Sequence, residues 1–299
     1  MDRLTALAPA ALVVLWSSGF VGATLAARNA AAGTTLLWRY VVAAALMVAV
    51  VSLLGRTYRF SFLVREGVVG VLGQGGYLLG VFYAAERGLP AGTIALVASL
   101  QPALVVVVLS LGGERGGLRR VIGLALGLFG VVLVVGGGPA AGDGVGVLVA
   151  ALGMVSLSVA TLLAQVWPPD LRHDVIDSLA VQSVVALAVF AAYAGATGTV
   201  TPPASPGFWA AVVWLVVLSF LGGHGAYLLV LRRSGAVVAS AWLYLTPATA
   251  AVWAWLMFGE ALTATAGAGF AVAATGVGTL LWRRRPRAGL PVQEPSAVV

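Results

Sequence analysis

The sequence predicts an all-α membrane protein with ten transmembrane helices arranged as two inverted five-helix repeats. Three observations support this fold class. The hydrophobic fraction of the 299 residues is 61% and the charged fraction is only 9%, ten apolar runs follow one another, and motifs of the first half recur in the second. A soluble domain usually has about 25% charged residues. A chain this apolar cannot hide its surface in a soluble fold, so we expect the lipid bilayer to be its partner.

Each expected span has about 20 mostly apolar residues, which is the length of a helix that crosses the hydrocarbon core. The first span resembles a signal peptide in its position, but its length and the close succession of spans favour a retained helix. Short connections rich in Gly and Pro end the helices. The expected spans are residues 7–27, 35–54, 67–86, 91–112, 119–137, 144–166, 178–196, 207–230, 236–258 and 263–282.

A long apolar segment with one central proline occurs twice. Pro247 follows Pro102 after 145 residues, and Glu260 ends the second copy much as Glu114 ends the first. Because each half has five spans, an odd number, the second half enters the membrane in the opposite sense. Inverted repeats of this kind are typical of secondary transporters, whose substrate site lies near the midplane between the halves.

The same repeat sets the expected domains and aligns further residues. The motif around Tyr77 recurs around Tyr227 after 150 residues, which places Gln74 opposite His224, and Arg39 corresponds more weakly to Gln182. We expect a first repeat over residues 1–138, a second over residues 139–285, and a disordered cytoplasmic tail over residues 286–299.

The arginines predict the orientation. With both termini in the cytoplasm, only Arg28 and Arg87 lie outside and Arg39 lies within a span, which agrees with the positive-inside rule. The arginines then on the inside are Arg3, Arg56, Arg59, Arg65, Arg115, Arg119, Arg120, Arg172, Arg232, Arg233, Arg283, Arg284, Arg285 and Arg287. They lie in short separate loops and form no continuous basic face, so we expect no nucleic acid partner.

Several short motifs resemble one known family, the EamA-type transporters of the drug/metabolite transporter superfamily. They are Trp16-Ser17-Ser18-Gly19-Phe20, Arg39-Tyr40, Gly88-Leu89-Pro90-Ala91-Gly92 through Gln101-Pro102, and Gly113-Glu114-Arg115. The resemblance covers residues 7–283 and implies a ten-helix inner-membrane exporter or permease for metabolites, amino acids or drugs. A His often stands at the position of Gln74 in similar sequences, whereas here the histidine is His224, so proton chemistry is not carried over to position 74.

Two ionisable side chains within spans are candidates for the substrate site. Arg39 could anchor a substrate carboxylate or join an ion pair in a cavity, or it could extend outward to the interface. His224 could relay a proton during coupled transport, or it could be a neutral histidine packed in the glycine-rich seam around it. We expect no Asp or Glu deep in any span.

Prolines, amides and aromatic residues complete the expected site. Pro102 and Pro247 free a backbone carbonyl, and they act either as hinges or as static kinks. Gln101, beside the first proline, and Gln74 are candidate substrate ligands, whereas Glu114 and Glu260 are more consistent with structural helix ends. Aromatic side chains suit a small amphipathic ligand, although they can also form an interfacial belt. The aromatic candidates, on spans that the family resemblance implies line the central cavity, are Trp16, Tyr77, Tyr227, Trp242 and Tyr244.

These residues predict a secondary transporter of small organic molecules that works by alternating access. With no Cys and only two His, the chain lacks the clustered ligands or nucleophiles that a metal site or an intramembrane enzyme needs. It also has no phosphate-binding loop for ATP hydrolysis, and we expect no cofactor. The alternative is a passive channel or a membrane scaffold that transports nothing. The substrate, the direction of flux, the coupling ion and the oligomeric state stay open at this point.

Overall fold

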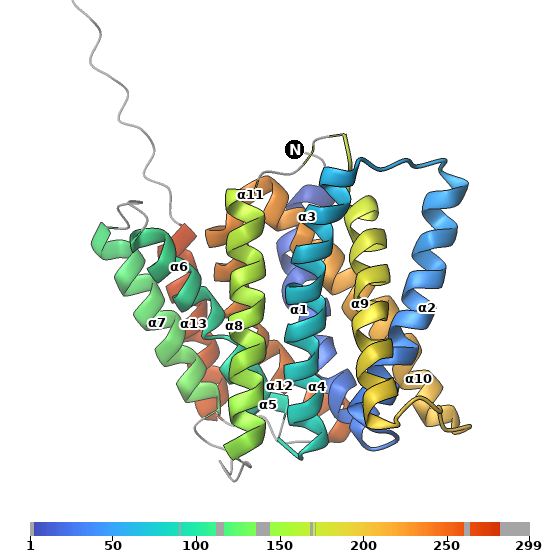
Figure 1. Ribbon diagram of the computed structural model, residues 1–299. Coiled ribbons are helices and arrows are strands. Elements are labelled where there is room, and N and C mark those ends of the chain that lie inside the picture. The colour runs from blue at the N-terminus through green and yellow to red at the C-terminus, as the bar shows by residue number, and fades with distance from the viewer. Residues whose placement is uncertain are drawn as a thin grey trace, which may run out of the picture.

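The computed structural model describes residues 3–89, 91–111, 117–135, 144–167, 170, 172–259 and 264–281. All regular secondary structure in these ranges is helical (Figure 1). The elements are α1 (Arg3–Ala27), α2 (Ala32–Leu53), α3 (Phe60–Gly70), the π-helix η1 (Val71–Gly76), α4 (Tyr77–Glu86), α5 (Ala91–Ala98), α6 (Gln101–Leu111), α7 (Gly117–Val135), α8 (Gly144–Val166), α9 (Val175–Thr197), α10 (Pro206–Trp214), the π-helix η2 (Leu215–His224), α11 (Gly225–Leu243), α12 (Thr246–Phe258) and α13 (Ala264–Leu281).

Seven stretches of the described chain are long and apolar enough to cross a membrane. They are Leu7–Ala27, Ala32–Leu53, Phe60–Glu86, Ala91–Leu109, Gly144–Val166, Val175–Thr197 and Pro206–Leu243, and a shorter apolar helix covers Val121–Gly130. The last long stretch has 38 residues and includes one expected span and the start of the next. Gly235, with φ 82° and ψ 172°, interrupts the helix at the expected boundary between them. The chain is therefore a multi-pass membrane protein.

One expected boundary is wrong in a way that matters for function. The third span was expected to begin at residue 67, whereas the helical stretch begins at Phe60. Glu66 and Arg65 therefore lie within a candidate span, and both are buried. Glu66 is thus an acidic residue near the end of a candidate span, where Gln182 and Arg232 from other helices contact its carboxylate.

The two central prolines occupy equivalent places in the fold. The α5 helix ends at Ala98, and α6 begins at Gln101 with Pro102 as its second residue; likewise α11 ends at Leu243, and Pro247 is the second residue of α12. Proline is tolerated in the first turn of a helix, where its missing N–H has no intrahelical partner. Each proline therefore starts a new helix after a short turn and does not bend one continuous helix.

Helix packing repeats when the two halves are exchanged. The α2 helix packs against α9, α4 packs against α8, and α1 packs against η2. The α2 and α9 helices are equivalent spans of the two halves. The contact of α4 with α8 is equivalent to the contact of η2 with α1, because α4 and η2 belong to equivalent spans and α8 corresponds to α1. In Figure 1 the helices stand roughly parallel, and α1 begins on the same side of the molecule on which α13 ends.

The glycine-rich helices α7 and α13 pack against each other within one chain. A Cβ atom on Gly276 would lie 2.5 Å from the backbone nitrogen of Gly127, so the two backbones approach as closely as glycine allows. Small residues permit such contacts between membrane helices. The sequence left open whether this seam joins two helices of one chain or of two chains, and the fold places it within one.

Candidate substrate site

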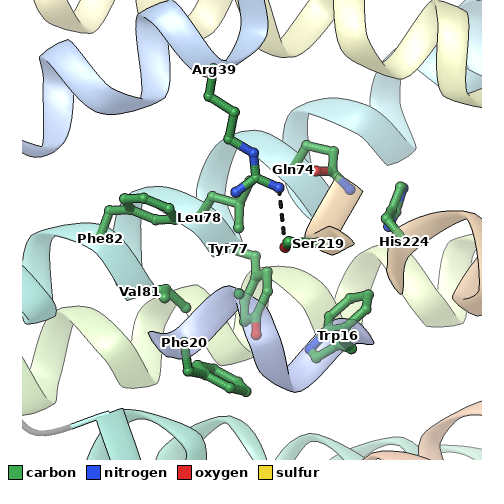
Figure 2. A pocket seen from close by; sticks show the side chains of 11 residues that line it. Trp16, Phe20, Arg39, Gln74, Tyr77, Leu78, Val81, Phe82, Ser219 and His224 are labelled. Carbon is green, nitrogen blue, oxygen red and sulfur yellow. Dashed lines mark hydrogen bonds between the residues drawn. The ribbon is translucent and has the colours of Figure 1, made fainter. Parts of the chain in front are cut away.

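A small cavity is lined by side chains from both halves of the chain (Figure 2). Its volume is about 30 Å³, which has room for one or two water molecules but not for a metabolite. Its lining comes from α1, α2, η1, α4 and η2 and consists of Trp16, Gly19, Phe20, Arg39, Gln74, Tyr77, Leu78, Val81, Phe82, Ser219 and His224. Five residues expected to bind substrate are thereby brought together, although their contact with substrate stays a prediction.

Arg39 extends from α2 into this cavity, as Figure 2 shows. Its side chain is 2% exposed, and its Nη2 donates a hydrogen bond of 3.4 Å to the Oγ of Ser219. Gly19 makes room for this serine, because a Cβ atom at that position would lie 2.6 Å from the Ser219 Oγ. Arg39 therefore faces the cavity and does not extend outward to the interface.

Gln74 belongs to η1, the π-helix that joins α3 to α4. Its Oε1 accepts a hydrogen bond from the hydroxyl group of Tyr40 on α2. A π-helical turn is uncommon and occurs frequently at functional sites. Here the π-helix η1 carries Gln74, whose side chain is hydrogen-bonded to α2, the helix that also carries Arg39.

His224 ends η2, the corresponding π-helix of the second repeat. Its Nε2 lies 2.7 Å from the Oε1 of Gln182 on α9. Because the Nε2 of Gln182 donates a 2.7 Å hydrogen bond to Glu66, its Oε1 is the acceptor and the histidine Nε2 is the donor. The Nδ1 of His224 has no hydrogen-bond partner among the described residues. The second repeat thus holds its histidine by a chain of side chains that reaches Glu66.

Aromatic rings form one wall of the site. The Trp16 ring lies 5.8 Å from Tyr77, 6.1 Å from His224 and 5.0 Å from Tyr227, measured between ring centroids. The Tyr227 hydroxyl is 2.6 Å from the Oγ1 of Thr161. These rings provide apolar surface beside a few polar groups, a combination typical of small-molecule sites.

The other residues expected in the site lie outside the cavity lining. Gln101 donates a 3.1 Å hydrogen bond to Thr161 and so lies one contact behind Tyr227. Trp242 packs at the edge of the main core, and Tyr244 packs in a separate cluster with Val277. Glu114 and Glu260, expected to be structural, lie outside the described residues.

A second cavity, of about 200 Å³, is lined by residues of α3, α8, α9 and α11, and Arg232 is among them. Its lining includes Glu66, which is 1% exposed. The Glu66 carboxylate pairs with Arg65 and lies 3.9 Å from the Nη2 of Arg232. Arg232 comes from the second repeat and also donates 2.7 Å to the carbonyl of His173. This network links the two repeats on one side of the central cavity.

The loop before α3 strengthens the same side. The Tyr58 hydroxyl donates a 3.2 Å hydrogen bond to the buried Asp177 carboxylate at the start of α9. Burial raises the pKa of Tyr58 to about 12, and the adjacent negative charge of Asp177 adds to the increase. Tyr58 therefore stays a neutral donor at physiological pH, which preserves this contact between the repeats.

The opposite side is closed by fewer polar contacts. The Thr34 hydroxyl donates to the carbonyl of Thr199 at 2.8 Å, and the Trp38 Nε1 donates to the carbonyl of Val200 at 2.9 Å. Apolar side chains of Phe20, Val81 and Phe82 form this end of the central cavity. Contacts between the repeats are therefore present on both sides of the central cavity.

Sequence reasoning missed several groups that shape the site. Tyr40 appeared only as part of a motif, and Gln182 appeared only as a weak match to Arg39. Ser219 has no distinguishing pattern, because a serine within a membrane helix usually bonds its own backbone. Glu66 could have been suspected from its charge so close to an apolar run, since such residues are usually functional or paired.

The candidate spans define a multi-pass membrane protein, and residues of both halves line a small cavity among its helices. The model of the EamA-like transporter family matches residues 4–136 and again residues 144–282. The chain therefore belongs to the EamA-like transporter family, and it contains two copies of the family's repeat. No curated protein matches it.

Solved structures support the same fold. The fold is similar to that of one protein of known crystal structure, with a TM-score of 0.74. The match covers 94% of this chain and 97% of the chain in the crystal structure. The two sequences are 21% identical, so the similarity establishes the fold and nothing about substrate.

Proposed function

We propose that this protein is a secondary transporter that moves small organic metabolites, such as amino acids or related compounds, or drugs, across the inner membrane. The observation that carries the proposal is the central cavity, to which both repeats contribute polar side chains. Arg39 and Gln74 come from the first repeat, and Ser219 and His224 come from the second. A ligand held by both halves would couple their relative movement to its own passage.

The proposed architecture has ten spans in two inverted sets of five. Three helix contacts support this architecture: α2 packs against its equivalent α9, and the contact of α4 with α8 is matched by that of η2 with α1. The interruption at Gly235 supports two spans within the stretch Pro206–Leu243. We place both termini in the cytoplasm, on the side of the arginine-rich loops, and we expect net export.

The small volume of the central cavity favours alternating access over a continuous pore. Its volume of about 30 Å³ cannot hold a metabolite, so substrate must enter through a rearrangement of the helices. Contacts between the repeats close each side, and breaking them on one side at a time would open the cavity to that side. We propose that the turns before Pro102 and Pro247 act as the hinges of this movement.

Counterflow in proteoliposomes tests the proposal. Purified protein is given a pool of labelled amino acids and related metabolites at pH 6 and pH 8, and saturable exchange is measured. A carrier shows exchange that is accelerated by unlabelled substrate on the other side, whereas a passive channel does not. Absence of saturable exchange for the whole pool would contradict the transport proposal.

The same assay tests proton coupling through His224. We expect His224→Ala to lower exchange and to remove any difference between the two pH values, because histidine is the residue type in the cavity lining whose ordinary pKa lies nearest to neutrality. A matched Gln74→Ala variant changes the equivalent position of the first repeat. If exchange by His224→Ala equals that of the wild type at both pH values, His224 does not transfer a proton during transport.

A further inference from the structure

The central cavity contains a buried cation, Arg39, whose charge no described residue neutralises. Among the described residues, Arg39 forms no salt bridge, and its Nε and Nη1 atoms have no hydrogen-bond partner. Its one side-chain hydrogen bond, to Ser219, is long at 3.4 Å. Burying a charge without a partner costs free energy, so an unpaired charged residue within a membrane protein usually marks a site that binds an ion or a ligand.

Neighbouring rings compensate this charge only in part. The guanidinium carbon of Arg39 lies 5.4 Å from the centroid of the Tyr40 ring and 5.7 Å from that of Phe82. Such contacts stabilise a cation through the ring faces. They accept no in-plane hydrogen bond, so the planar fork of N–H groups is still available for an oxyanion.

The remaining lining offers little to a positively charged group. No Asp or Glu is among the residues that line the cavity. The Gln74 Oε1 already accepts a hydrogen bond from Tyr40. The acidic residue nearest in the network, Glu66, is occupied by Arg65, Gln182 and Arg232 in the neighbouring cavity. An ammonium group in the central cavity would therefore meet a cation and no counter-charge.

The apolar wall indicates what the rest of the ligand resembles. Trp16, Tyr77 and Phe20 line the cavity opposite Arg39, and Tyr227 lies behind Trp16. Flat rings at this spacing favour an aromatic or similarly apolar body by stacking. The site thus combines one anion-binding fork with an aromatic wall.

We propose that the central site takes an organic monoanion, with a carboxylate on an aromatic or apolar body, in preference to a zwitterion or an amine. The proposal rests on the proposed function only in placing the substrate in this cavity. Arg39 binds the carboxylate through its unpaired N–H groups, and the Ser219 hydroxyl lies beside it. The aromatic wall contacts the body of the ligand.

Three probes with one phenylethyl skeleton test the charge preference directly. Binding of 3-phenylpropionate, phenylalanine and 2-phenylethylamine to the purified full chain in detergent is measured by calorimetry at pH 7. We expect 3-phenylpropionate to bind at least tenfold more tightly than either of the others, since a charge-assisted hydrogen bond corresponds to about tenfold or more in affinity. Equal binding of the three, tighter binding of the amine, or no binding of 3-phenylpropionate would overturn the proposal.

Substitutions at Arg39 identify the group responsible. We expect Arg39→Gln to weaken 3-phenylpropionate binding about 10- to 100-fold and to leave 2-phenylethylamine no weaker. Arg39→Lys keeps the charge but not the fork, so its affinity falls between the two. The control is Arg28→Gln, which removes an exposed arginine that lies over the Phe258 ring; its probe affinities match the wild type. Unchanged anion binding by Arg39→Gln contradicts the assignment.

The experiment separates this inference from the transport proposal. Binding of 3-phenylpropionate without its exchange in proteoliposomes supports the inference and contradicts transport. Saturable exchange combined with a preference for the zwitterion or the amine supports transport and contradicts the inference. The wild-type comparison of the three probes needs no variant, so it holds even if Arg39→Gln fails to fold.

Discussion

Each repeat joins its second helix to its π-helix through a hydrogen-bonded pair of side chains, but the two pairs differ in chemistry. In the first repeat, Tyr40 of α2 donates to Gln74 of η1. In the second, Gln182 of α9 accepts from His224 of η2 and passes the connection on to Glu66. The first pair is neutral and ends at the cavity, whereas the second links the cavity to a buried ionic network. A symmetric scaffold therefore supports an asymmetric site.

The largest expected effect comes from removing Glu66, the charged residue at the end of the hydrogen-bond series His224–Gln182–Glu66. In Glu66→Ala, Arg65 and Arg232 lose their shared buried carboxylate and Gln182 loses its acceptor. We expect the free energy of unfolding to fall by about 3 kcal/mol, because breaking a buried ion pair leaves uncompensated charge. Thermal unfolding in detergent, followed by circular dichroism, measures the change.

Glu86→Ala provides the matched control on the other side of the molecule. Glu86 is exposed, and its carboxylate accepts a 3.2 Å hydrogen bond from the backbone of Ala32. Its loss is expected to cost about 1 kcal/mol or less. If the two variants unfold at the same temperature, the network around Glu66 does not hold the repeats together.

A smaller effect is expected from a pair of equivalent glycines in the π-helices. A Cβ atom on Gly223 would lie 2.7 Å from the backbone nitrogen of Trp16, whereas one on Gly73 would meet only the Cβ of Ala160 at 3.4 Å. We expect Gly223→Ala to destabilise the protein by about 1–3 kcal/mol through overpacking. Gly73→Ala is expected to change stability by about 0.5 kcal/mol or less. Unfolding midpoints of the two variants, measured side by side, test this difference, and a reversed order would contradict the close contact of η2 with α1.

The smallest expected effect concerns the neutral pair of the first repeat. Tyr40→Phe removes the hydroxyl that donates to Gln74 and leaves a buried amide oxygen without that donor. We expect a loss of about 1–2 kcal/mol in unfolding free energy. In the double variant Tyr40→Phe/Gln74→Leu both partners are gone, so the cost of the unpaired amide disappears. Strict additivity of the two single changes in this cycle would show that the side chains do not interact.

The sequence alone determined the class of this protein and most of its helices. Apolar runs of about 20 residues predict spans because lipid offers the backbone no hydrogen-bond partner, so helices form locally. Pro102 and Pro247 likewise predicted a break at equivalent places, since the missing N–H acts within one turn, although the structure shows helix starts there and not kinks within one helix. Arg39 and His224 stood out because charged and titratable groups are rare in such runs.

Only the tertiary structure decided which of these groups share a cavity and which are already paired. Gln182 meets His224, and Glu66 meets Arg232, across long stretches of sequence, and no local pattern encodes those contacts. Tyr244 was grouped with the aromatic candidates because the family resemblance implies that its span lines the cavity, yet helix packing places it in a separate cluster. Spans follow from transfer to lipid, which depends on composition, whereas the pairing of polar groups depends on how the helices pack against one another.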